Sequence, residues 1–225
     1  FYLPLFMRCN HRVFISERAI EQTKKFYKTN SVETTYAERL LYIPNYVTIP
    51  EQYPSKISAT AFSVVYVGRG TSEKRAFLVA EIAKAWFEKK LPVTFQVVGD
   101  IEPPQELKNN SSIVFTGELT DMEKLKDIYK NADALLITSE REGFPMAIME
   151  GMAYGVIPVS TPVGDIPKHI RSGETGYLTS SIEPQQVITE MVNYISLLIH
   201  EKEKRLVMSK RVFEYAKEHF SKEKF

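Results

Sequence analysis

Seven short apolar runs recur along the chain, and each is continuous rather than alternating in polarity. They are rich in valine and isoleucine, which is typical of strands that are covered on both faces, as in a parallel sheet. The runs occupy residues 12–16, 40–44, 62–68, 93–99, 112–117, 134–139 and 156–160. The pattern therefore predicts a set of buried, parallel strands.

Segments with helical spacing alternate with these runs. The apolar faces of the first two, at 73–90 and 121–132, are Val79, Ile82, Ala83 and Trp86, and Met122, Leu125, Ile128 and Tyr129. Two more helices are predicted at 184–200 and 203–220. Alternation of strands and helices with short connections predicts an α/β fold: a Rossmann-like parallel sheet with helices on both faces.

Glycine and proline divide the chain into regions. All 10 glycines lie between Gly68 and Gly176, which indicates a domain with glycine loops in the middle. Residues 49–60 contain two prolines and little apolar content, so they are predicted to be a linker. The predicted division is therefore 1–48, the linker 49–60, a main domain at 61–200 and a terminal helix at 201–225.

The composition excludes several classes of protein. The chain has 225 residues, is 44% hydrophobic and carries a net charge of +1, which favours a globular core and argues against a nucleic-acid binder. The single cysteine, Cys9, excludes an internal disulfide and favours a reducing compartment. No apolar run approaches the roughly 18 residues of a membrane span. Because the chain begins at Phe1, we expect a fragment of a longer protein.

The ends of the predicted strands carry the candidate site. In open parallel sheets, ligands bind beyond the carboxyl ends of the strands. Gly68, Gly99 and Gly117 stand at three such ends, and the run 134–139 leads directly to Glu140 and Glu142. We therefore expect these residues to converge on one edge of the sheet.

The segment 67–75 has the composition of a phosphate-binding turn. Gly68 and Gly70 allow the backbone to turn tightly and approach a ligand, while Arg69 and Lys74 supply cations for a diphosphate. The segment matches neither the Walker pattern nor the dinucleotide fingerprint. A solvated helix start with ordinary surface cations remains an equal alternative.

Two acids flank a Gly-Phe-Pro turn. Glu142 precedes the turn and Glu150 lies inside the helix predicted to follow, with Pro145 at its first position. The amides from Gly143 to Met146 would open toward the cleft. Paired oxygens of a carboxylate suit vicinal hydroxyls, as in a ribose or hexose. The alternative is that both are ordinary helix-surface acids.

Other polar residues carry weaker signals. Gly164 follows a strand and would bring amides near an anion, whereas Gly173 and Gly176 are predicted to be turn residues. The four histidines have no metal-ligand spacing, and His169 is expected at the surface. We predict no metal site.

These stretches occur in a familiar order. The segments VGRGTSEKR (67–75), FQVVGD (95–100) and the run from Ile113 to Leu178 together resemble the C-terminal, donor-binding domain of the group 1 (family 4) glycosyltransferases, which are retaining enzymes of the GT-B fold. The family signature of two glutamates separated by seven residues is matched by Glu142 and Glu150. Residues 219–225 resemble the family's terminal helix, and residues 11–21 and 40–47 resemble the end of its N-terminal domain and the crossover.

The resemblance implies a role for each candidate residue. Arg69 and Lys74 would hold the nucleotide diphosphate, and Glu150 the ribose. Glu142 would be the catalytic residue, in contact with the donor sugar or near its anomeric carbon. The remaining implied donor-binding positions are Gly68, Gly99, Gly117 to Leu119, Gly143, Phe144, Pro145 and Met146.

The sequence also departs from the family pattern. Lys74-Arg75 replaces a frequent Lys-Gly, Gly164-Asp165 a Gly-Gly, Lys168 a glutamate, and Asn45-Tyr46 an Asn-Gly. These changes leave the identity of the sugar open. The first part of the family's N-terminal domain, with its acceptor site, has no counterpart here.

The expected activity follows from the resemblance. A sugar would pass from a nucleotide diphosphate sugar to a glycan, lipid-linked or small-molecule acceptor with retention of configuration and without a metal cofactor, as in polysaccharide biosynthesis. The enzyme would be cytoplasmic, with peripheral membrane contact through the absent N-terminal part, and the isolated fragment inactive. The alternatives are a nucleotide-sugar epimerase of the same fold, a non-catalytic binding module, and a glycoside hydrolase that uses Glu142 and Glu150. The cations in 67–75 argue against the hydrolase.

Overall fold

The computed structural model describes residues 10–30, 38–54, 61–89 and 92–224. It contains two compact units, residues 1–45 and residues 46–225. Cys9 and the second part of the predicted linker, residues 55–60, lie outside the described residues.

The smaller unit is a strand–helix–strand element. β1 (Arg12–Phe14) and β2 (Leu40–Tyr42) pair in parallel, and α2 (Glu17–Thr29) connects them. The hydroxyl of Ser16 caps α2 by accepting a hydrogen bond of 3.3 Å from the amide of Ala19. Both strands are shorter than the apolar runs that predicted them.

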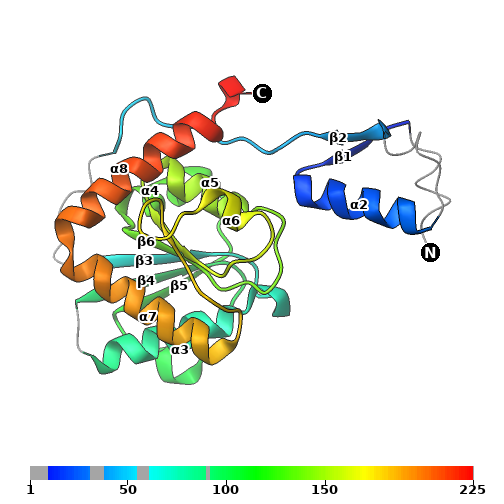
Figure 1. The fold of residues 1–225 in the computed structure, drawn as a ribbon. Coiled ribbons are helices and arrows are strands. Elements are labelled where there is room, and N and C mark those ends of the chain that lie inside the picture. Colours follow the sequence, from blue (N-terminus) through cyan, green and yellow to red (C-terminus); the bar gives the residue numbers. More distant parts are fainter. Residues whose placement is uncertain (1–9, 31–37, 55–60, 90–91, 225) are drawn as a thin grey trace. The chain divides into compact units, whose positions relative to one another are not determined.

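The larger unit is built around one parallel sheet, shown in Figure 1. Its strands are β3 (Phe62–Val67), β4 (Val93–Val98), β5 (Ile113–Gly117), β6 (Ala134–Ile137), β7 (Ile157–Ser160) and β8 (Tyr177–Leu178). Its α-helices are α3 (Ala76–Glu88), α4 (Met122–Asn131), α5 (Met146–Ala153), α6 (Ile166–His169), α7 (Pro184–His200) and α8 (Lys202–His219). Single 3-10 turns occur at Ser72–Lys74, Gln105–Leu107 and Lys222–Lys224. The predicted fold class is confirmed.

The strand order determines where a crevice forms at the edge of the sheet. The order is β5-β4-β3-β6-β7-β8, and every pair is parallel. The chain builds outward from β3 in one direction and then returns to build outward from β6 in the other. The order therefore reverses between β3 and β6, which makes a crevice beyond their carboxyl ends. The short β8 and α6 escaped prediction because two and four residues show no periodicity.

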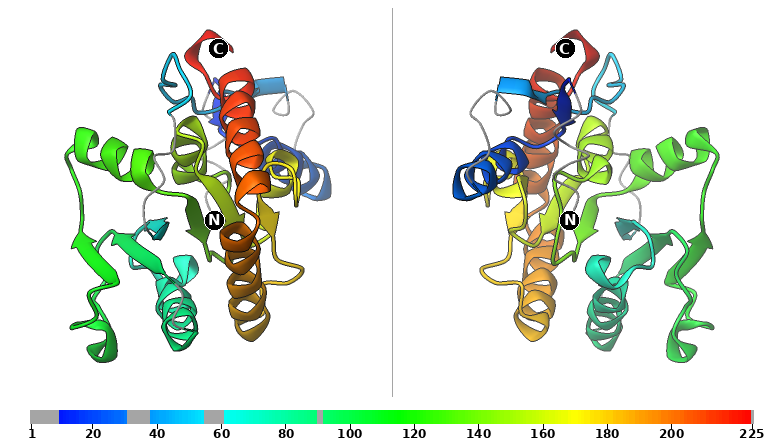
Figure 2. Two further views of the ribbon diagram at one scale, coloured as in Figure 1. Left: turned by 90° about the vertical axis from the view of Figure 1, so that its left-hand side faces the viewer. Right: turned by 90° about the vertical axis from the view of Figure 1, so that its right-hand side faces the viewer.

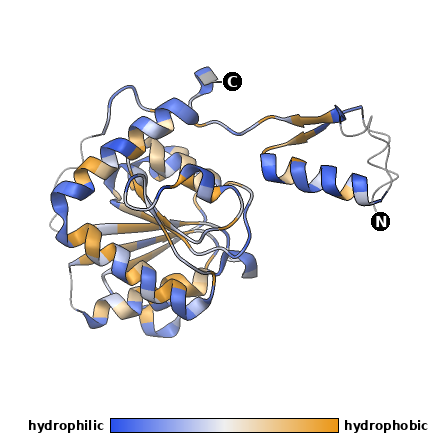
Figure 3. Cartoon of the chain, in the orientation of Figure 1, coloured by the Kyte–Doolittle hydropathy of each residue, from blue (hydrophilic) through white to orange (hydrophobic). Residues whose placement is uncertain are grey.

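Helices cover the sheet on both faces. α3 packs against α7, and α5 packs against α8. Figures 1 and 2 show the first pair on one side of the sheet and α4, α5 and α8 on the other. In Figure 3 the central strands are predominantly hydrophobic, while the helices alternate between hydrophobic and hydrophilic positions. This distribution agrees with the apolar runs and helical faces of the sequence.

The predicted helical faces are confirmed with one exception. All four residues predicted for the face of α3 are buried. In α4, Leu125 and Tyr129 are buried, but Met122 is 54% exposed, so the buried part of this apolar face does not extend to Met122. Met122 is the first residue of α4, where it borders a cavity instead of the sheet.

The two ends of the larger unit pair with each other. The amide of Val47 donates a hydrogen bond of 2.9 Å to the carbonyl of Phe220, and Val47 forms a parallel bridge with Ser221. The chain that follows α8 therefore fixes the segment 46–48. This segment forms one wall of the cavity described below.

Candidate functional site

A lysine and a glutamate meet where the strand order reverses. Lys74 follows β3 and Glu142 follows β6, and the Nζ of Lys74 donates a hydrogen bond of 2.5 Å to the Oε1 of Glu142. The side chains are 18% and 9% exposed, so water screens this ion pair less than a surface pair. The sequence predicted that the strand ends at Gly68 and Glu142 lie at one edge of the sheet, and β3 and β6 are indeed neighbours; the contact of Lys74 with Glu142 was not predicted.

The backbone holds the two segments together. The amide of Glu140 donates to the carbonyl of Glu73 at 2.9 Å, and the hydroxyl of Thr138 donates to the carbonyl of Lys74 at 2.9 Å. The turn after β3 is thus attached to the loop after β6 on both sides of Lys74. These two hydrogen bonds hold the segments that carry the ion pair side by side.

One oxygen of Glu142 takes both of its hydrogen bonds. The Oγ of Ser139 donates to Oε1 at 2.7 Å, as does Lys74, whereas Oε2 has no hydrogen bond within the described part of the chain. Lys74 uses one of its three N–H groups in this contact. Each partner therefore keeps capacity for a ligand.

Arg69 does not join this pair. Its side chain is 75% exposed, and its guanidinium lies 3.7 Å from the carboxylate of Glu73, an exposed ion pair of small energetic value. The structure thus separates the two cations that the sequence grouped together. Lys74 is placed at the switch point, and Arg69 at the surface of the same turn.

Glycines at and near the strand ends allow neighbouring backbones to come into close contact. A Cβ on Gly99 would stand 1.8 Å from the carbonyl oxygen of Gly68, and one on Gly70 would stand 2.2 Å from that of Asp100. The amide of Gly99 also donates to the carbonyl of Gly117 at 2.9 Å. Their smallness is therefore required by neighbouring loops, which is a different reason from the predicted approach to a ligand.

The Gly-Phe-Pro turn is shaped by the loop after β7. A Cβ on Gly164 would stand 2.3 Å from the carbonyl oxygens of both Glu142 and Gly143, and the amide of Asp165 donates to the carbonyl of Gly143 at 2.8 Å. Gly164 thus contacts the turn itself rather than being free to face an anion. Pro145 is the N-cap of α5, not its first residue, because its ψ of 133° is still extended.

Phe144 anchors this turn in an aromatic cluster. Its ring centroid lies 4.3 Å from that of His169 and 5.3 Å from that of Phe220. His169 also forms a hydrogen bond of 3.1 Å with the hydroxyl of Tyr215. The expectation of an ordinary surface histidine was wrong, since His169 packs against the turn and against α8.

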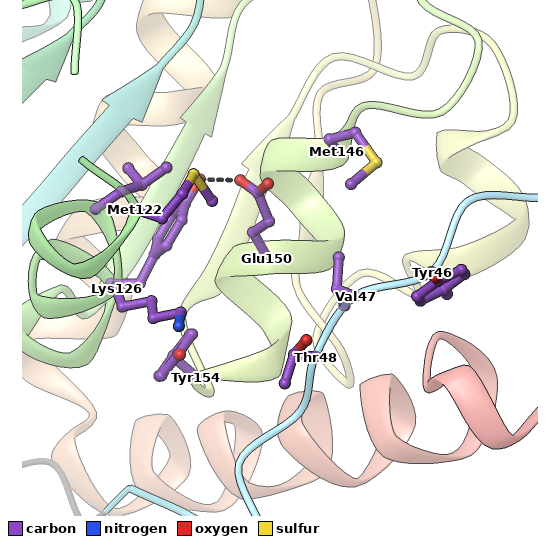
Figure 4. A pocket seen from close by; sticks show the side chains of 10 residues that line it. Tyr46, Val47, Thr48, Met122, Lys126, Met146, Glu150 and Tyr154 are labelled. Atoms are coloured by element: carbon purple, nitrogen blue, oxygen red, sulfur yellow. Dashed lines mark hydrogen bonds between the residues drawn. The ribbon is translucent and has the colours of Figure 1, made fainter. Parts of the chain in front are cut away.

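Glu150 borders a cavity of about 210 Å³. The cavity is lined by Tyr46, Val47, Thr48, Met122, Leu125, Lys126, Tyr129, Met146, Glu150 and Tyr154. In Figure 4 the carboxylate of Glu150 projects from α5, and a dashed line marks the hydrogen bond of 3.1 Å that it accepts from Tyr129. Burial raises the pKa of Glu150, and the bond from Tyr129 lowers it. The cavity is smaller than the roughly 300–1,000 Å³ of sites for whole drug-sized ligands, so it fits one end of a larger molecule.

Only some of the implied donor-binding positions border this cavity. Met146 is among its lining residues, whereas Gly99, Gly117 and Leu119 are not. Gly68 and Gly99 instead shape the turns at the ends of β3 and β4. The lining residues Tyr46, Lys126 and Tyr154 were not predicted, because their local sequence has no site signature.

Two buried polar side chains also escaped the sequence analysis. Arg75 is 6% exposed, and its Nε and Nη1 donate to the carbonyls of Thr138 (2.8 Å) and Ile182 (2.5 Å). Tyr66 is 2% exposed, and its hydroxyl has no hydrogen-bond partner within the described residues. Burial, and secondarily the charge of Glu142, raises the pKa of Tyr66.

Neither a metal cluster nor a membrane span is found in the part of the chain that is described. No group of three or more His, Cys, Asp or Glu side chains there has the geometry to hold a metal ion. None of the helices described is both long enough and apolar enough to cross a bilayer.

The parallel sheet with helices on both faces defines a domain of the Rossmann-like class, and the ion pair stands at the switch point where ligands bind in such folds. The sequence model described as "Glycosyl transferases group 1" matches residues 61–197, which is more than half of the chain. The chain belongs to this family.

Curated relatives and solved structures agree with that assignment. The chain is 25% identical over 221 residues to the N-acetyl-alpha-D-glucosaminyl L-malate synthase of Bacillus anthracis, which covers 93% of this chain and 55% of that protein. It is 28% identical over 196 residues to the GtfA subunit of a UDP-N-acetylglucosamine–peptide N-acetylglucosaminyltransferase of Streptococcus agalactiae, covering 78% of this chain and 37% of that protein. The chain thus spans about half the length, or less, of these relatives.

A structural neighbour supports the fold. The pneumococcal O-GlcNAc transferase GtfA, solved in complex with UDP and GlcNAc, superposes with a TM-score of 0.76 at 20% identity and covers 99% of this chain and 45% of that one. The similarity therefore includes the small unit as well as the large one.

Proposed function

We propose that this chain supplies the donor site of a glycosyltransferase. The whole protein would transfer a sugar from a nucleotide diphosphate sugar to a glycan, lipid-linked or small-molecule acceptor, with retention of configuration. The observation that carries the proposal is the ion pair of Lys74 and Glu142 at the switch point of the sheet, with the cavity at Glu150 on the helix that follows. Membership of the group 1 family supports the same activity.

The proposed donor extends from the cavity to the ion pair. Its nucleoside occupies the cavity, where Glu150 accepts hydrogen bonds from the ribose hydroxyls. The diphosphate lies at the turn after β3, where the two N–H groups that Lys74 does not give to Glu142 donate to its oxygens. Arg69 reaches the same anion from the surface, because its exposed pair with Glu73 is weak enough to exchange.

Glu142 then serves the sugar half of the donor. Its Oε2 accepts from a sugar hydroxyl, or faces the anomeric carbon as positive charge develops there. Lys74 and the amides near Gly143 stabilise the departing diphosphate, so no metal is required for that step. The same lysine therefore orients the carboxylate and neutralises the leaving group.

The test separates the two acids. After a thermal-shift screen of nucleotide sugars, calorimetry would compare Glu142→Gln and Glu150→Gln, with Glu203→Gln in α8 as an exposed control. Glu150→Gln should weaken the nucleoside diphosphate about tenfold, or roughly 1.4 kcal/mol. Glu142→Gln should weaken the nucleotide sugar while leaving the nucleoside diphosphate nearly unchanged.

Two results would contradict the proposal. If both variants weakened binding of the nucleoside diphosphate equally, the proposed position of the donor would be wrong. If the unaltered chain bound no nucleotide sugar, the proposal of a donor site would be wrong. Retention is tested separately, by the anomeric configuration of the product formed by the full-length protein. Binding without turnover in that protein would indicate a binding module.

A further inference from the structure

Tyr129 lines the cavity, and its buried hydroxyl has no role in the donor site proposed above. Tyr129 is 1% exposed, and its hydroxyl donates a hydrogen bond of 3.1 Å to the Oε2 of Glu150. Tyr129 belongs to α4 and Glu150 to α5, so this bond joins two helices along the cavity wall. The Oε1 of Glu150 has no hydrogen bond within the described part of the chain.

Packing fixes the position of this hydroxyl. The ring of Tyr129 is stacked on that of Tyr154, with centroids 6.3 Å apart and an interplanar angle of 11°. On another side it lies beside Gly151, where an added Cβ would stand 3.6 Å from the Cε1 of Tyr129 and 3.1 Å from the side chain of Leu135. A tyrosine has two side-chain torsions, so a packed ring leaves its hydroxyl little freedom.

We propose that Tyr129 is a positioning residue of the donor site: its hydroxyl holds one oxygen of Glu150, so that the other is presented to the hydroxyl groups of a bound nucleoside. The inference rests on the proposed function, because it assigns a second residue to the same cavity. The carboxylate would otherwise sample several rotamers, and ordering it before binding removes part of the entropic cost of association.

Electrostatics give this role a measurable signature. Burial raises the pKa of Glu150, and the bond from Tyr129 opposes that rise. Burial, followed by the charge of Glu150, raises the pKa of Tyr129, so its hydroxyl remains a donor. The other titratable groups that border the cavity are Lys126 from α4, whose amine is bonded to Glu123 at 2.7 Å, Tyr154, which follows α5, and Tyr46 from the segment 46–48.

The sign of the pH effect follows from these directions. The ionised carboxylate accepts hydrogen bonds from a diol, so affinity falls as the pH drops through the raised pKa of Glu150. Tyr129→Phe removes the contact that lowers this pKa. The midpoint of the fall in affinity should therefore move to higher pH in that variant.

The experiment uses UDP as the probe and calorimetry between about pH 5 and pH 8. The phosphate also titrates, but it does so equally with every variant, so differences between variants report the protein. Tyr194→Phe is the matched control, because it removes a tyrosine hydrogen bond of the same 3.1 Å length, to the carbonyl of Leu178. Tyr129→Phe should weaken UDP about fivefold at neutral pH, or roughly 1 kcal/mol, and shift the midpoint, while Tyr194→Phe should do neither.

A double variant tests whether Tyr129 acts through Glu150. In a Glu150→Gln background, Tyr129→Phe should cause little further loss, since the group that it orients is already altered. Additive losses, an unchanged affinity in Tyr129→Phe, or a loss without a shift of the midpoint would each overturn the inference and leave the donor site intact. If the unaltered chain binds no UDP and no other nucleotide, the proposed function fails, and the inference fails with it.

Discussion

Arg75 offers a prediction in which the backbone and the side chain have opposite effects on stability. Its φ of 49° makes it the one non-glycine residue with positive φ in the described part of the chain. A side chain in this left-handed region costs about 1–2 kcal/mol. The same residue is held by two charged hydrogen bonds, to the carbonyls of Thr138 and Ile182.

The magnitude follows from these two terms. Each charged hydrogen bond is worth about 1.5–3 kcal/mol net of desolvation, so the two together contribute about 3–6 kcal/mol. Arg75→Gly loses these bonds but relieves about 1–2 kcal/mol of backbone strain. We therefore expect a net destabilisation of about 3 kcal/mol, or a fall in Tm of roughly 6–12 °C for a chain of this size.

Comparison with Arg75→Ala isolates the backbone term. Alanine loses the same bonds but keeps the strained φ, so it should be about 1 kcal/mol less stable than glycine, or roughly 2–4 °C lower in Tm. At Arg69, which lacks positive φ, the order should reverse, because glycine increases the freedom of the unfolded chain. Two control variants at Arg69 complete the set.

Fluorescence provides a specific assay. Trp86 is the single tryptophan of the chain and has no exposed surface, so its emission during urea and thermal unfolding reports the larger unit. Equal stability of the glycine and alanine variants would refute the left-handed conformation of Arg75. A stability equal to that of the unaltered chain in both would show that the guanidinium bonds contribute nothing.

Two further predictions concern the same edge of the sheet. Tyr66→Phe should raise Tm by roughly 2–4 °C. The reason is that the buried hydroxyl lacks a hydrogen-bond partner within the described residues, so its removal recovers about 1 kcal/mol. A lower Tm in the same fluorescence assay would show that the hydroxyl is bonded. If the proposed donor site binds UDP, that binding should persist in the presence of a chelator, because Lys74 supplies the positive charge that faces the diphosphate. Calorimetry that lost the signal with chelator and regained it with manganese would contradict this.

The sheet could be predicted from the sequence because the apolar runs mark the order of the strands along the chain and show that they are buried. The run 62–68 became β3 and the run 134–139 became β6, which are neighbours although α3, β4, β5 and α4 separate them along the chain. Strand–helix alternation and the preference for ligands at strand ends were enough to predict that Gly68 and Glu142 lie at one edge. The contact between Lys74 and Glu142 was not predicted, because spacing along a chain does not determine which cation reaches which carboxylate.

The substitution of Arg75 for a glycine shows why polar positions resist prediction. The family often has glycine at this position, and the sequence alone offers no structural reason for it. The structure supplies one: the backbone turns through the left-handed region that glycine adopts freely.

The guanidinium of Arg75 donates hydrogen bonds to two carbonyls from separate loops, and these bonds oppose the cost of the strained backbone. The pattern of hydrophobic and polar residues places an arginine at the surface. It therefore could not predict that Arg75 is only 6% exposed and connects two loops. The same reasoning applies to Tyr129, which was predicted as core from helical spacing. Its ring is indeed buried, but its hydroxyl contacts Glu150 on another helix, and no local pattern encodes that partner.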